Sequence, residues 1–304
     1  MPQQTRAYWD LSLAMVIVGS SVVMGKIIIQ AFPVFLASGF RFLAAALIMI
    51  PLVWRSEGRL FAFCRRDWGV LFVMAFCGQF VFTVLLLIGL KHTSAVEAGL
   101  ITSTTPAMMA VLAALILKEP IGWRKAAGAL LAVAGVAAAG GLLSPQSLAR
   151  AEGHLLGNLL ICGAVVGEAA FLLLRKTLKP QASDMQATAA LVLLGFLMFL
   201  VPALFEVGEA RLAQAGPVQW GAILYFGAVY TALAYFLWFR GVSATPGAVA
   251  GVFTAVMPLS AVGLSWLVLG EPVTGEHLLG AAFVVGAILL TTLEGKPAGP
   301  KKAA

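Results

Sequence analysis

Long apolar runs separated by short polar breaks are the feature that most constrains the fold. A transmembrane helix needs about 20 mostly apolar residues, and this sequence offers a series of such runs. The polar breaks between them are all too short to form a soluble domain. We therefore predict an all-α polytopic membrane protein with ten transmembrane helices, at residues 9–30, 33–55, 68–90, 93–117, 121–141, 154–174, 185–205, 216–239, 246–269 and 274–293.

The composition also favours the bilayer over water. The 304 residues are 61% hydrophobic and 11% charged, whereas a soluble domain holds about 25% charged residues. A soluble chain of this composition would expose large apolar patches. A transmembrane β-barrel would need strands in which apolar and polar residues alternate, and runs such as LAAALIMIPLVW do not alternate.

The basic residues predict the orientation, because Lys and Arg collect in cytoplasmic loops. Ten spans place both termini on one side, which receives fifteen basic residues: Arg6, Arg55, Arg59, Arg65, Arg66, Lys118, Arg124, Lys125, Arg175, Lys176, Lys179, Arg240, Lys296, Lys301 and Lys302. The opposite side receives four: Lys26, Lys91, Arg150 and Arg211. We therefore expect both termini to be cytoplasmic. The net charge of +7 reflects this bias rather than a nucleic-acid partner.

The sequence also repeats itself with an offset of 152 residues. An ungapped alignment of residues 68–137 with 220–289 gives 17 identities in 70 positions. The matches include Trp68-Gly69 with Trp220-Gly221, Pro106 with Pro258, and Glu119-Pro120 with Glu271-Pro272. Apolar composition alone does not place these residues in one register, so we interpret the pattern as an internal duplication.

The repeat unit holds five predicted spans, and an odd number inverts the second copy in the membrane. We expect residues 1–145 and 146–304 to be the two halves of one transport domain, because inverted repeats are typical of secondary transporters. Inversion explains why the predicted cytoplasmic corner LKEPIGWRK is basic while its copy LGEPVTGEH is not. The corner itself is assigned a structural role, since Pro and Glu both suit the first turn of a helix.

With these features the chain resembles a known family. The five-plus-five duplication, together with TPAMMAVLAALILKEP and MPLSAVGLSWLVLGEP, is similar to the EamA-type carriers of the drug/metabolite transporter superfamily. Within that superfamily the chain looks most similar to bacterial inner-membrane exporters of aromatic amino acids, the YddG group. The resemblance implies an inverted-repeat bundle with a central cavity lined by spans 1, 3, 4, 6, 8 and 9.

Polar side chains within the predicted spans are candidates for function, because they are costly in a membrane. Glu168, near the middle of the sixth span, is either a cation-binding or proton-linked group or a helix–helix hydrogen-bonding group. Gln79 and its repeat equivalent Thr231 either line a cavity or link helices through hydrogen bonds.

A proline interrupts the fourth and the ninth spans at equivalent positions. Pro106 removes the helix hydrogen bond to the carbonyl of Thr102, and Thr254 with Pro258 repeats the arrangement. Broken helices in both halves are the best sequence pointer to a substrate site. The alternative is a pair of bent helices without ligand contact.

Two further groups of residues stand out in the spans. Phe171, Tyr230 and Trp266 would suit flat apolar substrates as cavity walls, although packing or lipid contact is the commoner role of a membrane aromatic. Lys26, Arg41 and Glu97 fall toward the outer ends of their spans. We expect Glu97 to pair with Arg41 or Lys26, as an outer gate or a structural ion pair.

The motifs that the sequence lacks narrow its function. It contains no GxxxxGK[ST] phosphate loop and no HExxH, so we predict no enzyme, no cofactor and no metal site. Our first hypothesis is an exporter of small amphipathic metabolites, foremost aromatic amino acids, that works by alternating access with or without proton coupling. The alternatives are an exporter of other amino acids, cationic aromatic compounds or drugs, and a non-transporting receptor or scaffold. The sequence does not indicate the oligomeric state.

Overall fold

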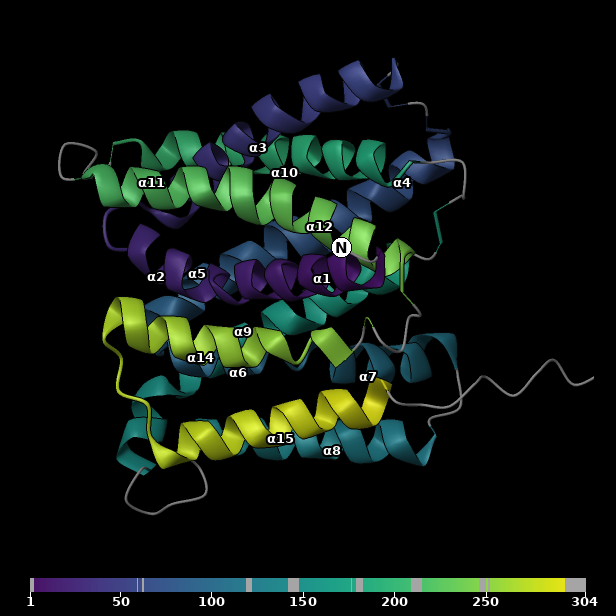
Figure 1. Ribbon diagram of the computed structural model, residues 1–304. Coiled ribbons are helices and arrows are strands. Elements are labelled where there is room, and N and C mark those ends of the chain that lie inside the picture. Colours follow the sequence, from purple (N-terminus) through teal and green to yellow (C-terminus); the bar gives the residue numbers. More distant parts are fainter. Residues whose placement is uncertain are drawn as a thin grey trace, which may run out of the picture.

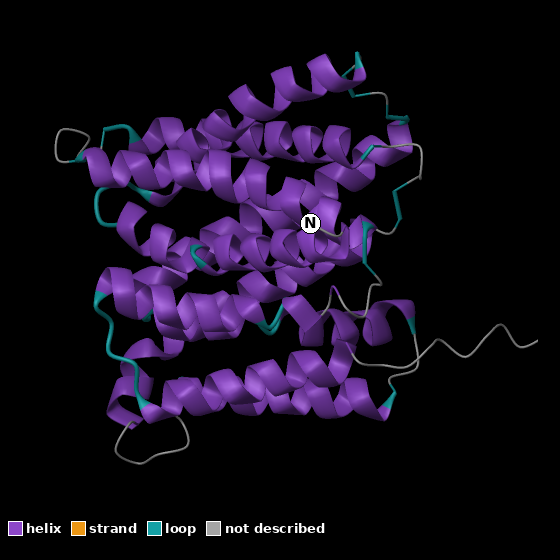
Figure 2. Ribbon diagram, viewed as in Figure 1, coloured by secondary structure: helices purple, strands orange, loops and turns teal. Residues whose placement is uncertain are grey.

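The computed structural model describes residues 3–58, 60–61, 63–118, 122–141, 148–175, 177–178, 183–208, 215–245, 250 and 252–292. These residues form helices joined by turns and loops, without a strand among them (Figure 2). In chain order the helices are α1 (Gln3–Gly19), α2 (Ser21–Ile28), α3 (Val34–Glu57), α4 (Arg65–Met74), η1 (Ala75–Val81), α5 (Phe82–His92), α6 (Ala95–Thr102), α7 (Thr105–Leu117), α8 (Trp123–Ala139), α9 (Leu148–Arg175), α10 (Asp184–Glu206), α11 (Pro217–Tyr225), η4 (Phe226–Leu233), α12 (Ala234–Ser243), α14 (Val256–Leu269) and α15 (Gly275–Thr292).

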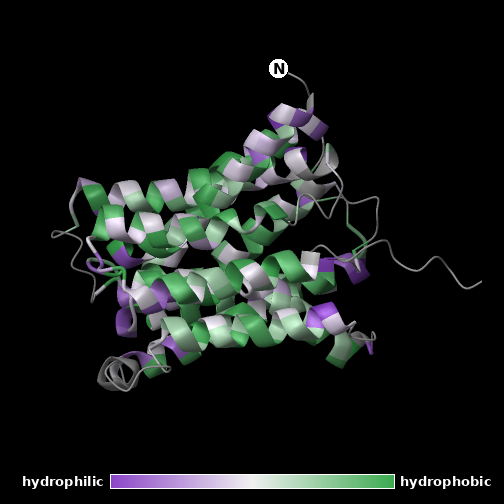
Figure 3. Cartoon of the chain, turned by 60° about the horizontal axis from the view of Figure 1, so that its bottom comes forward, coloured by the Kyte–Doolittle hydropathy of each residue, from purple (hydrophilic) through white to green (hydrophobic). Residues whose placement is uncertain are grey.

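The helices have the length and polarity of membrane spans. Within the described residues, 6 helical segments are long and apolar enough to cross a bilayer, or 7 when the bent pair α6–α7 counts as one span. Apolar residues dominate the middles of the helices, and polar residues gather toward their ends (Figure 3). The prediction of an all-α polytopic membrane fold is confirmed, while the count of ten spans stays a prediction.

The secondary structure repeats with the same offset as the sequence. Helices α4 and α8 begin at Arg65 and Trp123, and 152 residues later α11 and α15 begin at Pro217 and Gly275. The π-helical segments η1 and η4 also occupy equivalent positions in the two halves. π-helical turns often occur at functional sites, so the helices that contain η1 and η4 are candidates for a functional role.

Helices α8 and α15, which are copies of one another, pack side by side (Figure 1). A Cβ atom added to Gly128 would lie 2.5 Å from Cγ2 of Thr291, and one added to Gly280 would lie 2.8 Å from Cβ of Ala139. These two contacts are equivalent under the 152-residue offset, so the interface is reciprocal. The start of each helix meets the end of the other. The pair is therefore antiparallel, and the two-fold axis that relates its members is perpendicular to them.

The remaining helices pack in pairs that follow the same symmetry. Helix α5 packs on α9, and its copy α12 packs on α1; α7 packs on α9, and α14 packs on α1. Helix α3 packs on its own copy, α10 (Figure 1). Glycines permit the close approaches: a Cβ on Gly89 of α5 would lie 2.6 Å from the side chain of Ile161 in α9. Small residues at such contacts are the usual means of packing helices in membranes.

The helix break predicted from Pro106 is present. Helices α6 and α7 meet at an angle of 41° across Ser103 and Thr104. Pro106 has no N–H with which to bond the carbonyl of Thr102. The side-chain hydroxyl of Thr105 instead donates to that carbonyl, at 2.8 Å. A turn at Thr254 and Ala255 interrupts the corresponding region before α14.

Candidate functional site

A cavity of about 380 Å³ lies where the two halves meet. Residues from α1, the α6–α7 break, α9, η4, α12 and the start of α14 form its wall. The described lining residues are Met15, Val18, Thr102, Ser103, Thr105, Pro106, Met109, Glu168, Leu172, Tyr230, Ala234, Tyr235, Trp238, Thr254 and Met257. We refer to this space as the central cavity.

Both broken regions contribute to the central cavity. Thr102 and Thr254, which are equivalent in the sequence repeat, line the same space. Pro106 lies in the wall as well, whereas Pro258 is buried and does not reach it. The repeat symmetry therefore brings one threonine from each half to the cavity.

Glu168 is the acidic residue among the described lining residues of the central cavity. Its Oε2 lies 2.6 Å from the hydroxyl oxygen of Thr105, the same hydroxyl that donates to the carbonyl of Thr102. No Lys, Arg or His occurs in the described lining. The carboxyl group is thus positioned by the broken helix and faces a space that a ligand can enter.

Aromatic and sulfur-containing side chains make up much of the remaining wall. Tyr230, Tyr235 and Trp238 line the cavity on the side of η4 and α12, and methionines line it on α1, α7 and α14. Tyr230 stacks on Phe226 with ring centroids 4.9 Å apart. Flat rings and flexible thioethers together suit an apolar ligand body.

Arg41 stands behind this aromatic wall. Its guanidinium carbon lies 4.2 Å from the ring centroid of Phe226 and 5.1 Å from that of Tyr230. The residue is only 4% exposed, and its Nε has no hydrogen-bond partner. Cation–π contact with the rings compensates for part of the lost hydration. The expected place of Arg41 in an outer charge cluster is therefore wrong.

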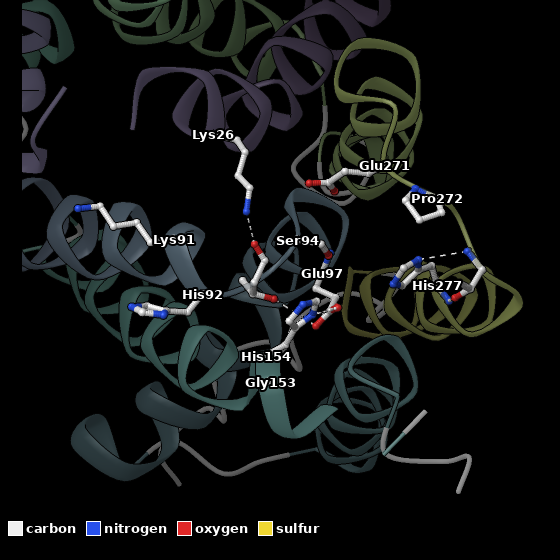
Figure 4. Close-up of a pocket in the computed structure, with 12 residues that line it drawn as sticks. Lys26, Lys91, His92, Ser94, Glu97, Gly153, His154, Glu271, Pro272 and His277 are labelled. Atoms are coloured by element: carbon white, nitrogen blue, oxygen red, sulfur yellow. Dashed lines mark hydrogen bonds and ion pairs between the residues drawn. The ribbon is translucent and has the colours of Figure 1, made fainter. Parts of the chain in front are cut away.

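A second site lies at the opposite end of α6 and α9, where Glu97 forms what we call the Glu97 cluster (Figure 4). Its carboxylate lies 2.7 Å from Nδ1 of His154 and accepts a 2.7 Å hydrogen bond from Asn158 Nδ2. The Thr93 hydroxyl oxygen lies 3.2 Å from the same carboxylate and 2.6 Å from Oδ1 of Asn158. The Glu97 side chain is 2% exposed. His154 and Glu168 are 14 residues apart on α9, which places the cluster about 21 Å along that helix from the central cavity.

Lys26 and Glu271 bind backbone groups around the Glu97 cluster. Lys26 Nζ donates to the carbonyls of Leu90 and Thr93, at 2.6 and 2.5 Å, where the C-terminus of α5 attracts a cation. The carboxylate of Glu271 accepts the backbone N–H groups of Ala95 and Val96, each at 3.0 Å. These contacts surround a pocket of about 520 Å³ (Figure 4).

The predicted pairing of Glu97 is wrong, because its contacts are with His154 and Asn158 of α9 and with Thr93 after α5, and not with α2 or α3. Lys26 does lie at the same end of the molecule, but it caps α5. The Glu-Pro corner is structural in the second copy: Glu271 caps the N-terminus of α6, a helix of the other half. Its counterpart Glu119 lies outside the described residues.

At the other end of the molecule, Arg240 of α12 joins Asp10 of α1 in a bidentate ion pair. Nε and Nη2 of Arg240 each donate to one carboxylate oxygen, at 2.6 Å. These hydrogen bonds raise the pKa of Arg240, which lies beyond the membrane-spanning part of its helix. Arg240 therefore stays protonated across the physiological range, and the pair fastens the two helices together.

Four predicted cavity residues lie elsewhere. Trp266 is 61% exposed on the outer surface of α14, and Phe171 packs in a buried cluster with Leu71 and Met74. Gln79 and Thr231 are buried in the π-helical segments. The Thr231 hydroxyl donates to the carbonyl of Phe226, at 3.0 Å, so it satisfies the local backbone.

Sequence reasoning missed Thr105, His154 and Asn158. Thr105 immediately precedes Pro106, and a hydroxyl beside a broken helix hydrogen bond is a signal that could have identified it. His154 and Asn158 carry no such signal, because they meet Glu97 only after α6 and α9 have packed together.

Comparison with known proteins identifies the family of the chain. The model of the EamA-like transporter family matches twice, at residues 6–140 and 155–293. The chain belongs to this family. An uncharacterized transporter of Bacillus subtilis, YetK, is 41% identical over 294 residues, which cover 97% of this chain and 89% of YetK. Another uncharacterized B. subtilis transporter, YyaM, is 25% identical over 277 residues, which cover 89% of this chain and 88% of YyaM.

The fold is also similar to a solved one. A crystal structure with 18% sequence identity superposes with a TM-score of 0.64, over 95% of this chain and 97% of that chain. This likeness shows the fold, whereas the family indicates a membrane transporter.

Proposed function

We propose that this protein is a secondary transporter that exports small amphipathic metabolites by alternating access, with aromatic amino acids as the first substrates to test. The observation that carries the proposal is the central cavity. It places a carboxyl group, threonine hydroxyls from both broken helices and three aromatic rings around one space of about 380 Å³. A ligand pocket of this kind combines an apolar lining with a few polar groups that fix orientation.

The proposed architecture is a five-plus-five inverted repeat of ten spans, with the halves at residues 1–145 and 146–304. Three observations support it: the family model matches twice, the helix boundaries recur after 152 residues, and the equivalent helices α8 and α15 are antiparallel. In inverted-repeat transporters the substrate site lies where the repeats meet, near the middle of the membrane.

The proposed orientation places both termini in the cytoplasm of a bacterial cell, with the protein in the inner membrane. The Glu97 cluster then lies on the outer side. The cavity lies farther along α6–α7 and α9, toward the ends that carry Leu117 and Arg175. In this arrangement the structure represents a state closed to the outside by the Glu97 cluster, Lys26 and Glu271.

A transport assay on the purified protein in liposomes tests the proposal. Vesicles are loaded in turn with tryptophan, phenylalanine, tyrosine, leucine and aromatic amines, and efflux is followed with radiolabelled compounds. We expect protein-dependent efflux of at least one aromatic compound, saturable with concentration. Binding without flux across the whole panel would instead support a receptor.

Export of cationic aromatic compounds is a second candidate. It is favoured by the charge of the cavity, because Glu168 has no Lys, Arg or His beside it in the described lining. A carboxylate with aromatic neighbours is a general device for binding organic cations. Aromatic amines in the same panel separate this candidate from amino acid export.

A further inference from the structure

The hydroxyl group of Thr105 lies between two oxygen atoms, and only one of them can receive its proton. Its hydroxyl oxygen lies 2.8 Å from the carbonyl of Thr102 and 2.6 Å from Oε2 of Glu168. A hydroxyl group has one proton to donate, and a backbone carbonyl can only accept. When Thr105 donates to Thr102, the short contact with Glu168 requires a proton on the carboxyl group. When Glu168 is ionised, the Thr105 proton turns toward it and leaves the Thr102 carbonyl without this donor.

Pro106 makes the second arrangement costly. In an uninterrupted helix the N–H of residue 106 would bond the Thr102 carbonyl, and proline lacks that N–H. Buried backbone carbonyls are nearly always paired, so the broken helix retains the Thr105 hydroxyl and favours a neutral Glu168. The charged form then needs another source of compensation.

Among the described residues that line the cavity with Glu168, none carries a positive charge. The titratable groups that share the cavity wall are Tyr230 of η4 and Tyr235 of α12. Arg41 of α3 stands behind Tyr230 and contacts its ring, and Arg175 ends the same helix as Glu168, two turns away. A ligand that enters the cavity is therefore the cation best placed to compensate an ionised Glu168.

From this geometry we propose that Glu168 holds either a proton or the ammonium group of the substrate, so that the protein exchanges one for the other. The inference rests on the proposed transport function and specifies its substrate class as amines with an aromatic or other apolar body. The ammonium group would sit at Glu168, with the apolar body against Tyr235 and Trp238. Thr105 is a positioning residue, because it links the carboxyl group to the broken helix.

The exchange has a defined charge balance. A proton from the outer side neutralises Glu168 after the substrate leaves, and the same proton departs to the cytoplasm when the next ammonium group binds. An amine cation exchanged for one proton moves no net charge. A zwitterionic amino acid exchanged for one proton moves one positive charge inward per cycle, so its transport responds to the membrane potential.

The test uses the full-length protein in liposomes and three probes that share an indole ring. Tryptamine carries an ammonium group, tryptophan carries an ammonium and a carboxylate, and indole-3-propionate carries only a carboxylate. We expect an imposed pH gradient to drive accumulation of a probe with an ammonium group, and no accumulation of indole-3-propionate. Glu168→Gln should reduce the gradient-driven accumulation about tenfold or more, the effect of losing roughly 1.4 kcal/mol of differential stabilisation.

Variants of neighbouring threonines provide matched controls. Thr105→Val should move the pH dependence of flux by about half a unit or more, the effect of one ordinary hydrogen bond, and Thr105→Ser should restore it. Thr104→Val should leave the profile unchanged, because the Thr104 hydroxyl bonds the carbonyl of Ile101 and not Glu168. A size-exclusion profile identical to wild type shows that each variant is folded.

The outcomes separate this inference from the proposed function. Absence of flux for every probe in the wild-type protein would overturn transport itself. Equal flux of all three probes, or full gradient-driven accumulation by Glu168→Gln, would overturn proton–amine exchange while leaving transport in place.

Discussion

The Glu97 cluster and the central cavity each hold a carboxyl group within the helices, but their surroundings differ. Glu97 is 2% exposed and has three side-chain partners, from His154, Asn158 and Thr93. Among the described residues, Glu168 has the hydroxyl of Thr105 as its side-chain partner and otherwise faces a cavity. A carboxylate whose partners are all protein groups stabilises a packed interface. A carboxylate with one such partner can still bind a proton or a ligand reversibly.

The largest expected effect comes from removing the Glu97 carboxylate, which we propose closes the outer end. Glu97→Ala removes the acceptor of His154 and Asn158, which are both partly exposed, and each lost hydrogen bond costs about 0.5–1.5 kcal/mol. We expect the Glu97 end to open more often. In a background without Cys64, Cys77 and Cys162, Thr102→Cys should then react about tenfold or more faster with a membrane-impermeant maleimide added outside spheroplasts.

A matched carboxylate at the opposite end controls for general loosening. Asp10→Asn breaks the bidentate pair with Arg240 and should not accelerate labelling from outside. Equal acceleration by both variants would mean that the Glu97 cluster has no special role in closing its end.

Two tryptophans provide a smaller test of what lines the cavity. Trp238 lies in the cavity wall, whereas Trp266 is 61% exposed on the outside of the bundle. Trp238→Leu should raise the KM for an aromatic substrate about three- to tenfold, the range that one lost aromatic contact produces. Trp266→Leu should leave it within about twofold, as expected for surface substitutions. Flux kinetics in liposomes measure both, and a larger effect of Trp266 would contradict the assignment.

The smallest effect should come from Lys26. Lys26→Met removes the two hydrogen bonds to the end of α5 but leaves Glu97 with all its partners. The cation–dipole interaction contributes about 0.3–1 kcal/mol, so labelling of Thr102→Cys from outside should rise about two- to fivefold. Lys91→Met, an exposed lysine at the rim of the same pocket, is the control that should change nothing.

The parts of the site that could be predicted from sequence are those that depend on local backbone chemistry. Pro106 defines a broken hydrogen bond at Thr102, and the duplication transfers that reasoning to Thr254; both threonines line the cavity. Glu168 could be identified because a carboxyl group within a membrane helix is energetically costly and usually has a function. Each of these inferences required only spacing along the chain.

The errors concern which face a side chain presents and which helix it meets. Helix α14 is apolar on every side, so its sequence cannot tell that Trp266 points outward. Arg41 appeared to be a partner for Glu97 because opposite charges attract, yet it is enclosed by aromatic rings. The duplication could not correct this, because position 249, the equivalent of Glu97, is a valine.

The reciprocal contact of α8 with α15 has a mechanical consequence. If the two halves exchange conformations between inward-open and outward-open states, the contact of Gly128 with Thr291 becomes that of Gly280 with Ala139, and the reverse. The pair as a whole is then the same in both states. Under that condition the α8–α15 pair does not move between the two states, and it provides a fixed reference against which the motion of every other helix can be measured.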